Sequence, residues 1–189
     1  LARRLQIPHI NTGAAYRLVA LLGWELGLSP KRQADVHQLC RMLRANSIEL
    51  TCDGGIRINS QQVFAALDVL AVERSVAHWA AIPAIREALH ETISRATKIS
   101  AAVIEGRDVK TVLRPDAAFA FYVEVTPKTR SALIAGRAGA KNRQLLQVAQ
   151  KRDSLDRGRV ISPAVVPRDA KRIRGQVNTE RVVSRLLRV

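Results

Sequence analysis

The stretch ISAAVIEGRD, residues 99–108, joins an apolar run to a charged end. Short runs that are apolar on both faces are typical of strands buried inside a parallel sheet. A second such run, AAFAFYVEV, occupies residues 117–125. Because segments with helical periodicity lie before and after these runs, we expect an α/β fold in which helices flank a parallel sheet.

The remaining segments supply those helices and one hairpin. Alternating apolar residues at 48–52 and 56–58 flank an Asp-Gly-Gly turn, which predicts a β-hairpin. With the helix before it, this hairpin forms a small insert over residues 30–75. The spacing of apolar residues and the helix-start signals predict helices over residues 1–7, 14–28, 31–46, 67–77, 83–98, 126–158 and 179–189.

Charge is distributed unevenly along the 189 residues. The net charge is +15, and residues 128–189 hold 16 Lys/Arg against 4 Asp/Glu, so that this third alone carries +12. Such a field favours a polyanionic partner or a phosphorylated substrate. The two cysteines stand twelve residues apart, and together with the scattered histidines they argue against zinc and structural disulfides. This use of cysteine suits the reducing cytoplasm, where we expect the protein to be. No apolar run approaches the length of a membrane span.

Polar motifs follow the predicted strands at the edge where α/β proteins bind ligands. NTGAAYR follows PHI and EGRD follows AAVI, and each motif delivers an arginine, Arg17 and Arg107. The arginine fork suits a bidentate grip on phosphate. Asp108 can accept a hydrogen bond from an amino group on a base. The alternative is that Arg107 and Asp108 pair with each other on a loop.

The stretch KRDSLDRGR, residues 151–159, places Arg152, Asp156 and Arg159 at helical spacing on one face. Arg152 and Asp156 could bind the hydroxyls of a sugar, and Arg159 could bind a phosphate. A group of arginines around one phosphoryl group fits phosphoryl transfer, where positioning and charge neutralisation carry the catalysis. The alternative is a solvated charged surface.

Four motifs in order, INTGAAYR, IPAIREAL, VIEGRDVKTVLRPDA and KRDSLDRGRVISP, resemble the bacterial cytidylate kinases. These are the (d)CMP kinases of the P-loop nucleoside-monophosphate kinase group. The resemblance implies one domain over residues 1–189, with a CMP-binding insert at 30–75 and a lid region at 128–160. It also implies the transfer of a phosphoryl group from ATP to CMP or dCMP, assisted by Mg²⁺, by a monomer.

The resemblance implies a role for each matching residue. Thr12 and Arg17 would contact the CMP phosphate, and Arg86 and Asp108 would recognise the cytosine. Before the resemblance is considered, the alternative for Arg86 is an exposed helix arginine. The remaining implied roles are phosphate binding by Arg107 and Arg159, ribose binding by Arg152 and Asp156, and an ATP-facing position for Arg157. The arginines expected to act in catalysis are Arg107, Arg157 and Arg159.

The sequence also departs from the family pattern. No GxxxxGK[ST] phosphate loop occurs in the 189 residues. We therefore expect the first strand and this loop upstream of Leu1, and we expect the chain to be a fragment that is inactive alone. No residue of the chain is assigned to ATP phosphates or to a metal. The family has Asp at the position of Asn11, a small serine near Ala77 and Gly at the position of Lys110.

A second hypothesis belongs to another class of protein. The chain could be a catalytically dead kinase fold whose basic C-terminal third binds RNA as part of a ribonucleoprotein, with a steep salt dependence. The charged segment DAKRIRG, residues 169–175, favours this hypothesis. The full set of CMP-binding positions disfavours it.

Overall fold

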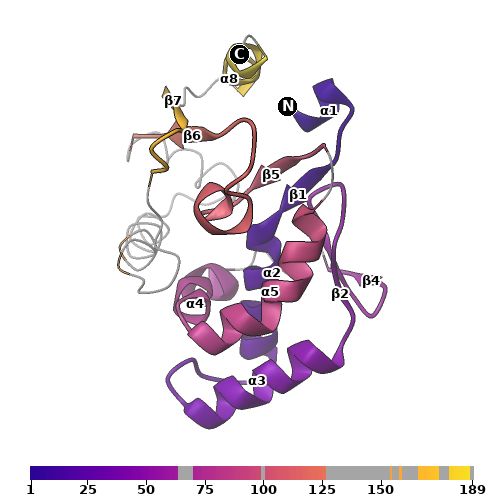
Figure 1. The fold of residues 1–189 in the computed structure, drawn as a ribbon. Helices are drawn as coiled ribbons and strands as arrows, with labels where there is room; N and C mark the ends of the chain where they lie inside the picture. Colours follow the sequence, from indigo (N-terminus) through magenta and orange to yellow (C-terminus); the bar gives the residue numbers. More distant parts are fainter. Residues whose placement is uncertain are drawn as a thin grey trace.

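The computed structural model describes residues 1–63, 70–98, 101–126, 154, 158, 166–174 and 179–187 (Figure 1). The elements in chain order are α1 (Ala2–Leu5), β1 (His9–Asn11), α2 (Thr12–Glu25), α3 (Gln33–Ala45), β2 (Ile48–Leu50), β3 (Ile56–Ile58), β4 (Gln61–Gln62), α4 (Leu70–Ala80), α5 (Pro83–Thr97), β5 (Val103–Glu105), a π-helical turn (Val109–Leu113), β6 (Phe121–Glu124), β7 (Lys171–Arg174) and α8 (Thr179–Leu186).

Two pairs of parallel strands confirm the predicted α/β class. Strand β1 pairs with β5, so that His9 lies opposite Val103 and Asn11 opposite Glu105. Strand β6 pairs with β7 in the same parallel sense. Within the described residues these pairs are separate two-stranded sheets, and β5 is not hydrogen-bonded to β6. The first strand expected upstream of Leu1 stays a prediction.

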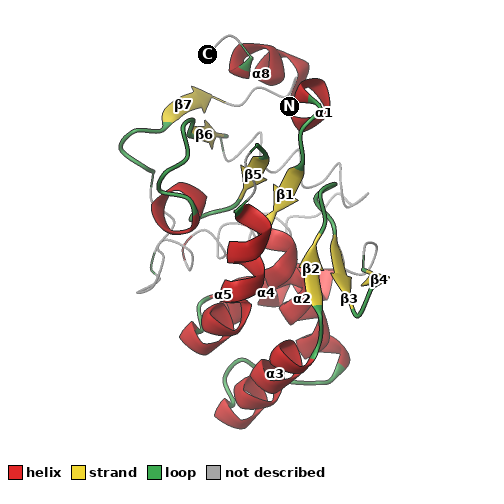
Figure 2. Cartoon of the chain, turned by 45° about the vertical axis from the view of Figure 1, so that its right-hand side comes forward, coloured by secondary structure: helices red, strands yellow, loops and turns green. Residues whose placement is uncertain are grey.

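Helices α2, α4 and α5 stand below the β1–β5 pair and enclose most of the core (Figures 1 and 2). Leu18, Trp79 and Leu89, one from each helix, are at most 1% exposed. The approach of α4 to α2 depends on Gly23, because a Cβ at that position would lie 2.8 Å from Cζ2 of Trp79. These contacts fix the spacing between α2 and α4.

The predicted hairpin is confirmed as the antiparallel pair β2–β3, and β4 adds a third short strand. Its turn is fixed by Asp53, whose Oδ1 accepts hydrogen bonds from the Thr51 hydroxyl and from the Gly55 amide. Gly54 has a φ of +86°, a conformation that glycine adopts without strain. The hairpin and α3 contribute buried residues to the same hydrophobic cluster as α2 and α5. The boundaries 30–75 of the insert stay a prediction.

Several expected boundaries differ from the observed ones. Helix α2 begins at Thr12, two residues before the predicted start, so Gly13 lies in its first turn. Helix α3 begins at Gln33, after a turn in which Asp35 accepts a hydrogen bond from the Ser29 amide at 2.7 Å and pairs with Arg32. Helix α4 continues to Ala80, because its apolar face packs against α2 as far as Trp79.

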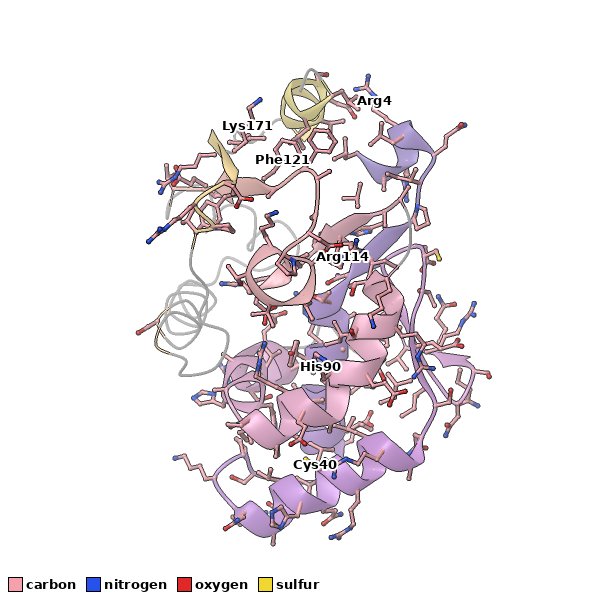
Figure 3. All side chains as sticks on the ribbon, viewed as in Figure 1. Arg4, Cys40, His90, Arg114, Phe121 and Lys171 are labelled. Carbon is pink, nitrogen blue, oxygen red and sulfur yellow. The ribbon has the colours of Figure 1, made fainter. Side chains whose placement is uncertain are left out.

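The two ends of the described chain lie close together. Arg4 on α1 forms an ion pair of 3.5 Å with Glu180 on α8, and Figure 3 shows the Arg4 side chain beside that helix. The helix predicted over residues 126–158 lies outside the described residues apart from Thr126, Ser154 and Gly158. Of the helices in the described ranges, none is long and apolar enough to cross a membrane.

Candidate functional site

The carboxyl ends of β1 and β5 meet at one edge, because the two strands are parallel and in register. Thr12 follows β1, and its hydroxyl donates a hydrogen bond of 3.0 Å to the carbonyl oxygen of Glu105 at the end of β5. The next residue, Gly106, passes so close that a Cβ there would lie 2.2 Å from Thr12 Oγ1. The motifs NTGAAYR and EGRD, which are predicted to flank a ligand, are therefore in tight contact where they leave β1 and β5.

Arg86 and Asp108 form a buried ion pair at this edge. Arg86 projects from α5, and its Nη2 donates to Oδ2 of Asp108, which follows β5. The two side chains are only 10% and 6% exposed. Arg86 Nη1 also donates to the Ala80 carbonyl at 3.2 Å, and the guanidinium carbon lies 5.2 Å from the centre of the Tyr16 ring. The interpretation of Arg86 as an exposed helix arginine is therefore wrong.

Arg17 lies on α2 near the same edge. Its Nε donates to Oε1 of Glu73 on α4 at 3.0 Å. Its Nη1 faces the first turn of α2, 3.5 Å from the point where a Cβ on Gly13 would sit. The Oδ1 atom of Asn11 lies 3.1 Å from that same point. The outer end of the Arg17 guanidinium is thus directed toward the carboxyl end of β1.

Arg107 and Asp108 differ in exposure although they are neighbours. Arg107 is exposed, whereas Asp108 is 5% exposed. The backbone turns at this point into the π-helical turn, in which the Val112 amide donates to the Asp108 carbonyl at 2.9 Å. The turn therefore holds the Asp108 carboxylate against Arg86, whereas the Arg107 residue is exposed.

Five predicted site residues come from three separate segments and gather around this edge: Thr12, Arg17, Arg86, Arg107 and Asp108. The other four lie outside the described residues: Arg152, Asp156, Arg157 and Arg159. The contacts also identify two residues that the sequence analysis missed, Tyr16 and Glu73. Tyr16 stands four residues after Thr12, a helical spacing that could have pointed to it. The sequence gives no signal for Glu73, because its contact with Arg17 depends on the packing of α4 against α2.

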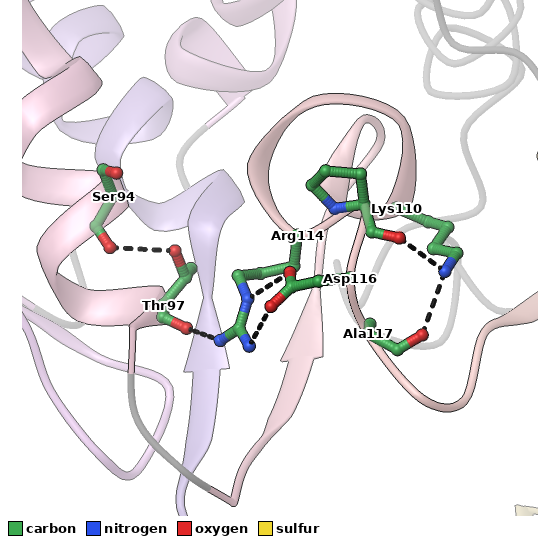
Figure 4. A network of polar contacts seen from close by, with 7 residues as sticks. Ser94, Thr97, Lys110, Arg114, Asp116 and Ala117 are labelled. Carbon is green, nitrogen blue, oxygen red and sulfur yellow. Dashed lines mark hydrogen bonds and ion pairs between the residues drawn. The ribbon is translucent and has the colours of Figure 1, made fainter.

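Lys110 lies outside the ligand edge. Its ammonium donates to the carbonyl oxygens of Pro115 and Ala117 at 2.8 and 2.9 Å (Figure 4). It also pairs with Asp169 at 3.0 Å. The hydrogen bond from Lys110 lowers the pKa of the Asp169 carboxyl. The lysine therefore joins the segment after β5 to the turn before β7.

Arg114 stabilises the same loop (Figure 4). It donates from Nε and Nη2 to the Asp116 carboxylate at 2.9 and 3.0 Å, and from Nη1 to the Thr97 carbonyl at the end of α5. The hydrogen bond from Arg114 lowers the pKa of the Asp116 carboxyl. Lys110 and Arg114 thus hold the connection between β5 and β6, and neither is part of the Arg86–Asp108 cluster.

Parallel strands with arginines and a buried carboxylate at their carboxyl edge define an α/β nucleotide-binding protein, here with the fold of the nucleoside-monophosphate kinases. The sequence pattern of the family described as "Cytidylate kinase" matches residues 1–189, and the chain belongs to that family. The resemblance seen in the four motifs is confirmed.

Individual relatives agree with this assignment. A cytidylate kinase of Pelotomaculum thermopropionicum is 30% identical over 180 residues, which cover 90% of this chain and 78% of the relative. One from Clostridium acetobutylicum is 29% identical, covering 92% of this chain and 80% of the relative. One from Mycobacterium leprae is 29% identical, covering 90% and 77%. The comparisons give no support to the RNA-binding scaffold.

Proposed function

We propose that this protein transfers the γ-phosphoryl group of ATP to CMP or dCMP, giving the diphosphate and ADP. The observation that carries the proposal is the buried Arg86–Asp108 pair beside the carboxyl ends of β1 and β5. A buried ion pair is a weak source of stability, since the desolvation of two charges offsets their attraction. A recognition role accounts better for its position at a ligand-binding edge.

The proposed base recognition uses complementary hydrogen-bonding groups. Cytosine presents an amino donor beside a ring nitrogen and a carbonyl oxygen that accept. The Asp108 carboxylate can accept from the amino group, and the Arg86 guanidinium, which carries five N–H groups, can donate to the acceptors while keeping its bond to Ala80. Uracil has a carbonyl oxygen where cytosine has the amino group, so the Asp108 carboxylate would face an acceptor instead of a donor, which is costly at a buried site.

The proposed phosphate recognition uses Arg17 and Arg107, with Arg159 from the lid region. Of the two described arginines, Arg107 follows β5, and Arg17 lies in the second turn of α2, the helix that follows β1. The Thr12 hydroxyl donates its one proton to Glu105, so we assign it the task of holding the two strand ends together. Its expected contact with the phosphate requires this hydroxyl to turn from Glu105 to a phosphate oxygen. Arg152 and Asp156 keep their proposed role at the ribose, and Arg157 its position facing ATP.

Mg²⁺ accompanies ATP in this family, but the described residues include no group of His, Cys, Asp or Glu that could hold a metal ion. Mg²⁺ usually keeps several waters and binds through substrate phosphates, so a kinase needs few protein ligands for it. We therefore assign no residue to the ion. When bound, it would neutralise the charge that develops on the transferred phosphoryl group.

A phosphoryl-transfer assay tests the proposal. The protein with its natural residues upstream of Leu1, where the phosphate loop is expected, is incubated with MgATP and equal concentrations of CMP, dCMP, UMP or AMP, because the 189 residues alone are expected to be inactive. The diphosphates are then separated and quantified. We expect CMP and dCMP to be phosphorylated with a kcat/KM at least about 100-fold above that of AMP, because a purine does not match the pocket. Equal rates for CMP and AMP, or no CDP at all, would contradict the proposed function.

A further inference from the structure

The guanidinium of Arg17 already has a carboxylate beside it, supplied by a different helix. Arg17 Nε and Glu73 Oε1 are 3.0 Å apart, and the two side chains are 22% and 27% exposed. A cation that is largely removed from solvent requires a nearby acceptor when no substrate is present. Glu73 provides that acceptor in the described structure.

The contact occupies only the inner part of the guanidinium. Glu73 is bonded to Nε, whereas Nη1 faces Gly13 and the carboxyl end of β1. The amino groups of the fork are the ones that form parallel hydrogen bonds to phosphate. The Glu73 carboxylate therefore lies at the Nε atom of Arg17, and not at the amino groups that would meet the substrate. It is near enough to repel an anion bound to those amino groups.

The position of Glu73 is fixed by the packing of its helix. Val72, Val76 and Trp79 on α4 are at most 1% exposed, and Trp79 packs against Gly23 on α2. Because α4 cannot move away from α2 without opening this core, the carboxylate cannot withdraw far from Arg17 when a phosphate arrives.

We propose that Glu73 is an internal counter-ion for Arg17 that weakens the binding of the substrate phosphate. This inference rests on the proposed role of Arg17 at the phosphate of CMP. A phosphate monoester carries close to two negative charges at neutral pH. Glu73 repels these charges and shares the guanidinium with them, so the affinity for the monophosphate is lower than an uncompensated arginine would give, and nucleotide release is faster. The Arg17–Glu73 pair thus lowers the affinity for the phosphate and leaves the contacts with the base unchanged.

Calorimetry on the whole protein and on its Glu73→Gln variant tests this inference. Glutamine keeps an oxygen that accepts from Arg17 Nε but removes the charge. We expect the Kd of CMP to fall by about fivefold at low salt, and the gain to shrink as salt is added. The Kd of cytidine, which has no phosphate, should stay the same. The matched control is Glu91→Gln, since Glu91 pairs with Arg95 at 3.3 Å on the exposed face of α5.

The outcomes separate the inference from the proposed function. An unchanged Kd for CMP in Glu73→Gln, while the parent protein binds CMP, would overturn the counter-ion role alone. Weaker CMP binding in both Glu73→Gln and Glu73→Ala would also overturn it, because it would show that Glu73 positions Arg17 for the phosphate. An Arg17→Met variant that binds CMP as well as the parent does would contradict the proposed role of Arg17, and the inference with it.

Discussion

Replacing Asp108 by asparagine should destabilise the protein and weaken its recognition of cytosine. The change leaves Arg86, whose side chain is 10% exposed, without its anionic partner. Breaking a buried ion pair typically costs about 3–5 kcal/mol. The amide oxygen still accepts from Arg86, and a hydrogen bond to a charged group recovers a part of that cost, which leaves a loss of about 2–3 kcal/mol.

Thermal denaturation measures this loss. For a chain of this size, 1 kcal/mol corresponds to about 2–4 °C in Tm, so we expect Asp108→Asn to lower the Tm by about 4–12 °C. The control is Asp116→Asn, which removes a carboxylate from the surface pair with Arg114 and should leave the Tm nearly unchanged. Adding Arg86→Met to Asp108→Asn should restore a part of the stability, since no unpaired charge then remains in the core.

The same variants test recognition. The side-chain amide of the Asp108→Asn variant presents a donor as well as an acceptor toward the base, so the preference for CMP over UMP should decrease in calorimetric titrations. A Tm unchanged within about 2 °C, the shift expected for less than 1 kcal/mol, combined with an unchanged preference for CMP over UMP, would refute the reasoning that Arg86 and Asp108 form a buried pair that recognises cytosine.

Contacts elsewhere in the fold give three further predictions. Gly23→Ala should destabilise the protein by about 1–3 kcal/mol in denaturant unfolding, because the new Cβ would overlap the Trp79 ring, and an unchanged midpoint would contradict the packing of α4 on α2. A thiol reagent should label Cys52, which is exposed, well before Cys40, whose pKa is raised by burial; faster labelling of Cys40 would contradict the core position of α3. Because the pKa of Asp169 is lowered, its pair with Lys110 stabilises the fold above the ordinary carboxyl pKa of 3.8, and this contribution is lost as the pH falls below that value. Asp169→Asn should therefore reduce the dependence of the Tm on pH in the acid range. An unchanged pH profile would contradict the pair.

Local patterns in the sequence predict much of this fold. The apolar run before Glu105, the turn at Asp53-Gly54-Gly55 and the helix that begins at Pro83 are each determined by neighbouring residues, and each is confirmed. The buried face of α3 also follows from its periodicity, since Val36, Leu39, Cys40 and Leu43 are the residues it buries.

Contacts between distant segments are harder to predict. The sequence places Arg86 and Asp108 in motifs 22 residues apart, but the ion pair between them depends on how α5 packs against the end of β5. The pairing of Arg17 with Glu73 depends on the approach of α4 to α2 at Gly23 and Trp79. A helix boundary also depends on local side-chain contacts, as at the start of α3, where Asp35 accepts from the Ser29 amide and pairs with Arg32.

A crystal structure of the protein with CMP tests the central claim most directly. We expect the cytosine ring to lie beside Arg86 and Asp108, with its amino group donating to the Asp108 carboxylate, and the phosphate to lie within about 3 Å of an Arg17 guanidinium nitrogen. A nucleotide bound away from the carboxyl ends of β1 and β5, or bound there with neither Arg86 nor Asp108 in contact with the base, would contradict the account.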